Sequence, residues 1–235
     1  MLYVTGDMHG DREFYKLNSK FFKEGKKLTK NDYVLVCGDF ACCWDNGAFD
    51  KYVQDWYNNK PWTTLFVDGN HENFDILNKY PVIEWNGGRA QKISDSIIHL
   101  MRGETYNIDG HTIFAFGGAQ SHDKLFRKEG VSWWKQEMPS EEEYENGLKN
   151  LDKINYEVEY VFTHCAPDEI FNRLRDCGFV PKGSYHDQLT NYLEIVRKEV
   201  ENKETFKGWY FGHYHDDFDF VGKYHLIFDK VRRLW

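Results

Sequence analysis

Residues 64–72 read TLFVDGNHE, an apolar run that stops at an Asp-Gly pair and passes into Asn70 and His71. Threonine, valine and phenylalanine favour strands, and a glycine directly after such a run indicates a tight turn. Four more apolar runs along the chain also end in side chains that can bind a metal: Leu2–Thr5 before Gly6-Asp7-Met8-His9, Tyr33–Val36 before Cys37-Gly38-Asp39, Tyr160–Thr163 before His164, and Trp209–Phe211 before Gly212-His213-Tyr214-His215.

Amphipathic stretches alternate with these runs and predict helices at Arg12–Lys23, Phe49–Asn58, Glu141–Ile154 and Gln188–Glu201. Asp109-Gly110 is a turn signal that predicts a hairpin of Glu104–Ile108 with His111–Phe116. A second hairpin is predicted between Phe218–Val221 and Tyr224–Phe228. Because no Gly/Ser-rich linker divides residues 1–235, we predict a single domain of the α/β class.

The composition limits the classes of protein to which the chain can belong. With 41% hydrophobic and 17% aromatic residues, the 235-residue chain can bury a sizeable core. A formal net charge of -8 argues against extended binding to nucleic acid, but not against a small anionic substrate at a metal centre. The sequence shows neither a signal-peptide pattern nor an apolar stretch long enough to span a membrane, and five cysteines are an odd number. These features predict a cytoplasmic protein.

The chemistry of the five strand ends is coherent. The carboxyl ends of parallel strands meet along one edge of a sheet, so the polar groups that follow the runs should share one crevice. Aspartate, asparagine and histidine without thiolate suit Mn, Fe, Zn or Co better than Ca or Mg. Four glycines each directly precede a proposed ligand, which allows close backbone approach: Gly6, Gly38, Gly69 and Gly212.

The ordered blocks of the chain resemble the calcineurin-like metallophosphoesterases, whose pattern is Asp-x-His, Gly-Asp, Gly-Asn-His-Glu, a later His, and Gly-His-x-His. Here the blocks are Asp7-Met8-His9, Gly38-Asp39, Gly69-Asn70-His71-Glu72, His164 and Gly212-His213-Tyr214-His215. The resemblance implies a four-layer α/β/β/α sandwich of two mixed sheets flanked by helices. It also implies two divalent or trivalent transition-metal ions and the hydrolysis of phosphate esters.

The resemblance also assigns roles to the residues. One ion would be held by Asp7, His9, Asp39 and His215, and the other by Asp39, Asn70, His164 and His213. Asp39 would bridge the pair, and a hydroxide shared by the ions would attack phosphorus. His71 would protonate the leaving oxygen or stabilise its charge, and Asn70 and His71 would contact the substrate.

The second block departs from the family pattern at Cys42, where relatives often carry an Asp that orients the block-three histidine. Asp45 or Asp68 could replace that partner of His71. The pair Cys42-Cys43 also stands where protein Ser/Thr phosphatases of the family show Asp-Arg, which argues against a dedicated protein phosphatase.

Two charged residues of the loop 117–127, which lies outside the blocks, have two possible interpretations. The loop 117–127 follows a strand, so Arg127 or Lys124 could hold a substrate phosphate, or both could be ordinary surface charges. Glu72 is expected to cap the following helix, and Ser140 with Glu143 to form a capping box.

The expected substrate is a small phosphate mono- or diester or a nucleotide. The alternatives are a non-catalytic metal-binding scaffold on the same fold and a nuclease. The sequence leaves the oligomeric state open.

Overall fold

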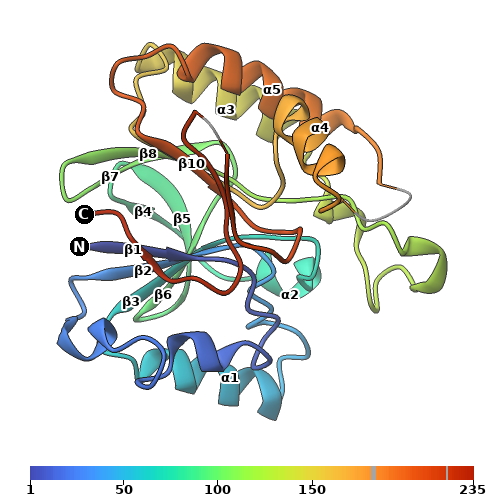
Figure 1. Cartoon of the computed structure of the whole chain (residues 1–235). Coiled ribbons are helices and arrows are strands. Elements are labelled where there is room, and N and C mark those ends of the chain that lie inside the picture. The colour runs from blue at the N-terminus through green and yellow to red at the C-terminus, as the bar shows by residue number, and fades with distance from the viewer. Residues whose placement is uncertain (181–183, 221) are drawn as a thin grey trace.

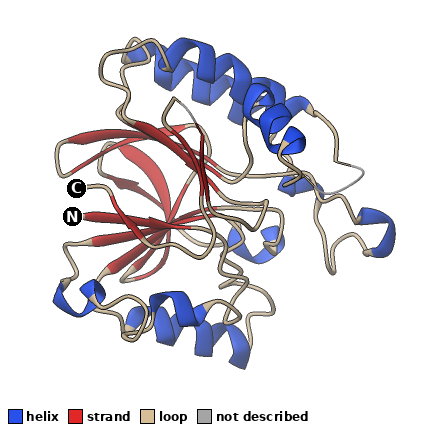
Figure 2. Cartoon of the chain, viewed as in Figure 1, coloured by secondary structure: helices blue, strands red, loops and turns tan. Residues whose placement is uncertain are grey.

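Two mixed β-sheets stack face to face, and helices cover both outer sides (Figures 1 and 2). The computed structural model describes residues 1–180, 184–220 and 222–235. The predicted four-layer α/β/β/α architecture is confirmed.

The first sheet has four parallel strands at its centre and antiparallel strands at both edges. In spatial order its strands are β13 (Arg232–Arg233), β1 (Leu2–Thr5), β2 (Tyr33–Cys37), β3 (Thr63–Val67), β6 (Ile97–Leu100), β5 (Gly88–Ser94) and β4 (Val82–Trp85). The carboxyl ends of β1, β2 and β3 therefore lie side by side.

The second sheet repeats this plan with parallel β12, β10, β9 and β8 between antiparallel edges. Its order is β11 (Phe218–Phe220), β12 (Tyr224–Leu226), β10 (Gly208–Phe211), β9 (Tyr160–Thr163), β8 (His111–Phe116) and β7 (Glu104–Ile108). Both predicted hairpins are confirmed, the second as far as Phe220 and Leu226, while Val221 lies outside the described residues.

Helices pack on the outer faces. Apolar side chains of α1 (Ala48–Asn58) and α2 (Phe74–Leu77) join the cluster outside the first sheet, and α3 (Glu141–Lys153), α4 (Asp168–Asp176) and α5 (Gln188–Val200) cover the second. Ser140 and Glu143 form the predicted capping box. Among the described residues, no helix is long and apolar enough to cross a membrane.

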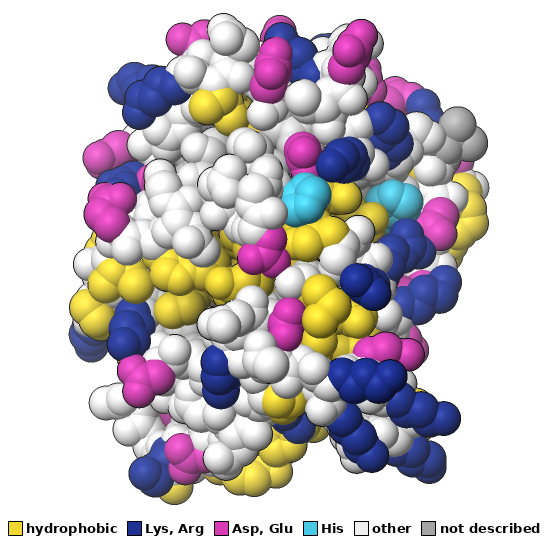
Figure 3. All heavy atoms as spheres, turned by 90° about the vertical axis from the view of Figure 1, so that its left-hand side faces the viewer, with side chains coloured by type: hydrophobic (Ala, Val, Ile, Leu, Met, Phe, Trp, Pro, Cys, Tyr) yellow, Lys and Arg dark blue, Asp and Glu magenta, His cyan; other side chains and the backbone are white. Residues whose placement is uncertain are grey.

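Three apolar clusters fill the spaces between the four layers. The middle cluster joins the inner faces of the two sheets, for example Val67 of β3 and Phe162 of β9. On the side of the molecule seen in Figure 3, hydrophobic side chains form a band across the surface between regions of mixed charge. Partly buried residues such as Tyr33, Trp85 and Trp235 pack against the middle cluster from outside.

One predicted helix is wrong. The segment Arg12–Lys23 forms turns and a short 3-10 helix at Phe14–Leu17 instead of an α-helix. The side-chain oxygen of Asn18 accepts hydrogen bonds from the backbone amides of Lys20 and Phe21, which takes these donors away from a helix.

Candidate metal centre

The structure brings the proposed ligands of all five blocks together at the carboxyl ends of the strands. Asp7, Asp39 and Asn70 follow β1, β2 and β3 of the first sheet. His164 and the pair His213 and His215 follow β9 and β10 of the second sheet. The ligand cluster therefore lies where the ends of the two sheets meet.

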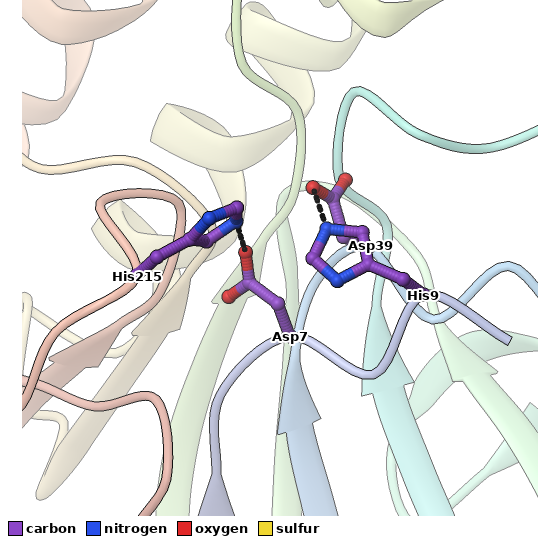
Figure 4. Close-up of side chains that lie close together, drawn as sticks. All are labelled: Asp7, His9, Asp39 and His215. Atoms are coloured by element: carbon purple, nitrogen blue, oxygen red, sulfur yellow. Dashed lines mark ion pairs between the residues drawn. The ribbon is translucent and has the colours of Figure 1, made fainter. Parts of the chain in front are cut away.

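Four of these residues form a compact cluster, shown in Figure 4. Ligand atoms of Asp7, His9, Asp39 and His215 all lie within 4.8 Å of one another. His215 Nε2 is 3.1 Å from Asp7 Oδ2, and His9 Nε2 is 3.4 Å from Asp39 Oδ2. Two carboxylates and two imidazoles are a ligand set that suits a transition metal.

A second cluster adjoins the first through Asp39. His164 Nε2 lies 3.3 Å from Asp39 Oδ1 and 3.2 Å from the side-chain oxygen of Asn70. The His213 ring centroid is 5.0 Å from that of His164. One oxygen of Asp39 thus faces His9 and the other faces His164, so its carboxylate is divided between the two clusters.

When the His164 ring is neutral, its Nε2 and the oxygens that it faces are all acceptors, which suits a cation. His164 Nδ1 donates to the backbone carbonyl of Cys37 at 2.8 Å, which leaves Nε2 as a lone pair in the neutral ring. That lone pair faces oxygens of Asn70 and Asp39. Burial disfavours the charged ring, but Asp39 and Asp7 outweigh it and raise the pKa of His164 to about 9. The site therefore attracts positive charge.

His9 shows the same tendency and has a partner that sequence reasoning missed. Its Nδ1 lies 3.3 Å from Glu13 Oε2, which turns Nε2 toward Asp39. Burial lowers the pKa of His9, but hydrogen bonds to Asp39 and Glu13 raise it to about 10. Carboxylate partners of this kind commonly orient metal-binding histidines. The sequence offered one indication of this pair, the spacing of four residues between His9 and Glu13.

The backbone of the ligand turns is unusual. His9, Asp39, His213 and His215 have φ values of 40°, 47°, 70° and 51°, in the left-handed region that side chains other than glycine seldom adopt. Such conformations persist where the surrounding structure enforces them, and they cluster at functional sites.

Glycine is required where the turns approach one another. A Cβ atom on Gly38, which has φ +94°, would lie 2.1 Å from His164 Nδ1. A Cβ on Gly69 would lie 2.1 Å from Asp39 Oδ1. Larger residues at either position would push a proposed ligand out of place.

His71 lies at the edge of the centre and is contacted by an arginine instead of a carboxylate. Its backbone amide donates to Asp39 Oδ1 at 2.7 Å. The Arg127 guanidinium approaches both ring nitrogens, with Nη1 2.9 Å from Nδ1 and Nη2 3.2 Å from Nε2. Asp123 and the backbone carbonyl of Ser132 hold Arg127 in this position.

The two carboxylates considered as partners of His71 are engaged elsewhere, so that expectation is wrong. Asp45 accepts from the backbone amide of Gly47. Asp68 is buried, with one oxygen 3.1 Å from His99 Nε2 and the other accepting from Arg102 Nε at 2.9 Å and from Arg102 Nη2. Sequence reasoning missed Arg102, since its partner precedes it by 34 positions.

Two further expectations can be compared with the structure. The Lys124 ammonium lies 2.7 Å from Glu137 Oε1, so this lysine has an acidic partner, and its role in substrate binding stays a prediction. The expectation that Glu72 caps a helix is wrong. Its buried carboxylate accepts from the amides of Phe40 and Ala41 in the neighbouring turn, and Asn73 caps α2.

A pocket of about 200 Å³ opens beside His213. Buried apolar and aromatic side chains contribute to its lining, including Ala119, Phe171 and Tyr214, and His122 and Lys124 add polar groups.

Comparison with known proteins identifies one family. A family model described as Calcineurin-like phosphoesterase matches residues 1–217. This span includes every proposed metal ligand. No curated protein matches the chain.

Proposed function

The chain belongs to the calcineurin-like phosphoesterase family, and we propose that it is a dinuclear enzyme that hydrolyses phosphate mono- or diesters of small molecules or nucleotides. Metal-dependent phosphoester hydrolysis is the activity of that family. The number of ions, their ligands and the class of substrate are the proposal.

The proposal of two ions rests on the Asp39 carboxylate, which has one oxygen facing each cluster. One ion would be held by Asp7, His9, Asp39 and His215, and the other by Asp39, Asn70, His164 and His213. Bound there, the ions would supply Lewis acidity and lower the pKa of a shared water. A carboxylate with one oxygen toward each cluster is the group that such a pair requires.

His71 and Arg127 would act on the substrate. His71 lies beside Asp39 at the rim of the centre, where it would protonate the leaving oxygen or stabilise its charge. The Arg127 fork matches the oxygens of a phosphate, and its contact with His71 supports a role at the same group. Asn70 would contact the phosphate in addition to its ion.

The pocket beside His213 favours a small substrate. Its volume of about 200 Å³ is below the roughly 300–1,000 Å³ typical of sites for drug-sized ligands. One ring or sugar would fit inside it. The net charge of -8 also disfavours an extended nucleic acid footprint.

The test is a metal-reconstituted screen over nitrophenyl mono- and diesters, cyclic nucleotides, dinucleoside polyphosphates, phosphopeptides and short oligonucleotides. We expect turnover of a small ester that chelation abolishes and metal restores, and almost none from Asp39→Asn prepared in parallel. Two bound metals without turnover of any compound would indicate a metal-binding scaffold. Preferential cleavage of oligonucleotides would indicate a nuclease.

A further inference from the structure

The side-chain amide of Asn70 can serve a cation in only one of its two orientations. Its oxygen carries lone pairs, whereas its NH2 group only donates hydrogen bonds. An amide turned by 180° would present N–H groups to the ion and would repel it. Something in the protein must therefore distinguish the two ends of this amide.

A chain of hydrogen bonds on the far side of the amide makes this distinction. Asn70 Nδ2 donates to Ser121 Oγ at 3.1 Å, while Asn70 Oδ1 lies 3.2 Å from His164 Nε2. Ser121 Oγ in turn donates to Glu137 Oε2 at 2.7 Å. Glu137 Oε1 accepts from the Ser121 amide at 2.9 Å and lies 2.7 Å from the Lys124 ammonium.

The direction of these bonds follows from the carboxylate at the end. An ionised carboxylate accepts only, so the single hydroxyl proton of Ser121 must point to Glu137. The oxygen of Ser121 is then left with lone pairs alone, and these can receive only the NH2 end of Asn70. The oxygen end is thereby turned toward His164 and Asp39.

Burial gives this arrangement its strength. Asn70, Ser121 and Glu137 are 4%, 3% and 0% exposed, so bulk water does not readily replace a lost partner. A buried carboxylate is costly without compensation, and Lys124 provides the opposite charge. Hydrogen bonds to charged groups in such surroundings are stronger than those between neutral groups.

We propose that Ser121 and Glu137, with Lys124 as counter-ion, are positioning residues that fix the orientation of Asn70 as a metal ligand. The proposal rests on the metal centre proposed above. The hydrogen bond between Asn70 and Ser121 connects the two sheets, because Asn70 follows β3 and Ser121 belongs to the loop after β8. Outer partners of this kind typically affect metal affinity by about 10- to 100-fold.

The experiment is calorimetric titration of the metal-free protein with Mn²⁺, which measures binding without reference to turnover. In Ser121→Ala we expect one of two binding steps to weaken about tenfold. The matched control is Ser96→Ala, which also removes a buried hydroxyl with one donor and one acceptor partner, here the Lys30 ammonium and the side-chain oxygen of Asn58. Ser96 directly precedes β6, whose amino end lies away from the centre, so both steps should be unchanged.

Glu137→Gln tests the direction of the bonds with little change of shape. The NH2 group of the new side chain can donate to Ser121, which either frees the serine proton to reverse the Asn70 amide or leaves a buried donor unsatisfied. We expect the same binding step to weaken as in Ser121→Ala. Unchanged Mn²⁺ affinity in both variants, with the fold intact by circular dichroism, would overturn the proposal.

A double-mutant cycle separates positioning from general damage to the loop. Asn70→Asp offers an oxygen at both ends and needs no orientation, so adding Ser121→Ala to it should cause no loss of Mn²⁺ affinity. Equal losses in both backgrounds would assign Ser121 a merely structural role. A wild-type protein that binds no Mn²⁺ would refute the metal centre itself, whereas normal binding by all variants would refute only the positioning.

Discussion

Arg102→Met should strongly destabilise the fold, because Arg102 is the main partner of a buried carboxylate. The side chains of Arg102 and Asp68 are 4% and 1% exposed. Arg102 donates to one Asp68 oxygen through two nitrogens and to the backbone carbonyl of Gln136 at 2.9 Å. These bonds join the turn after β3 to the segment that precedes α3. Methionine keeps much of the apolar stem but makes none of them.

The loss of unfolding free energy depends on the partners that Asp68 keeps when Arg102 is replaced. In the variant, His99 at 3.1 Å is the one side-chain partner that Asp68 keeps among the described residues. Removing one member of a buried ion pair typically costs roughly 3–5 kcal/mol. With a urea dependence of about 3 kcal/mol per M for a chain of this size, the midpoint should fall by roughly 1–1.7 M.

Urea unfolding followed by tryptophan fluorescence measures this change. The control is Lys149→Met, which removes a partner of Glu145 from a pair that is about two-thirds exposed on both sides. Such surface pairs contribute about 0–1 kcal/mol, so its midpoint should hardly move. A loss below about 1 kcal/mol in Arg102→Met would show that the buried pair is not a major source of stability and would refute the reasoning.

Four shorter predictions concern the site and the surface. Asp39→Asn should lower turnover by orders of magnitude, because an amide replaces the carboxylate shared by the two clusters and weakens the binding of metal. Near-normal turnover of a metal-loaded sample would contradict the assignment. His71→Ala should lose much activity on esters with poor leaving groups and less on nitrophenyl esters, and equal losses would remove the acid role. Arg127→Met should raise KM and weaken inhibition by inorganic phosphate, while unchanged phosphate inhibition would argue against contact with the substrate. A hydrogen bond from Arg232 lowers the pKa of Asp219 to about 2, so this carboxylate contributes stability above its unfolded pKa that is lost as pH falls toward 2. Asp219→Asn should flatten the acid limb of the stability profile, and an unaltered limb in urea titrations would rule this contribution out.

The grouping of the proposed ligands could be predicted because each of them follows the end of a strand. Asp7 and Asp39 follow apolar runs that form neighbouring parallel strands, and parallel strands place their carboxyl ends together whatever the loops between them do. The grouping of ligands follows from topology and needs no knowledge of side-chain contacts.

The surroundings of the ligands could not be predicted in the same way. Ser121 and Arg127 come from a loop without regular pattern, and they meet Asn70 and His71 across 51 and 56 positions. Such contacts depend on how one loop packs on another. Asn18 illustrates the same limit at the level of secondary structure, since a single side-chain oxygen overrides the helical pattern of its neighbours.

The strands β4, β5 and β6 were also missed. β6, Ile97–Leu100, is buried along its whole length, and β5 changes register near Ser94. His99 interrupts the apolar run of β6, and Arg89, Gln91 and Lys92 leave β5 without an apolar run. Pairing sets their positions in the sheet, β6 beside β3, β5 beside β6 and β4 beside β5, and the sequence does not display these pairings.

The left-handed turns at His9, Asp39, His213 and His215 have a consequence for how the protein responds to heat. Each of the four conformations costs on the order of 1 kcal/mol, which makes roughly 4 kcal/mol together. This is a sizeable share of the roughly 5–15 kcal/mol by which a typical domain is stable. Ions that bind only the folded form offset this cost, and the stabilisation grows with the logarithm of the metal concentration above the dissociation constant. The melting temperature should therefore rise as metal is added, so that a thermal scan distinguishes a metal-free preparation from a loaded one.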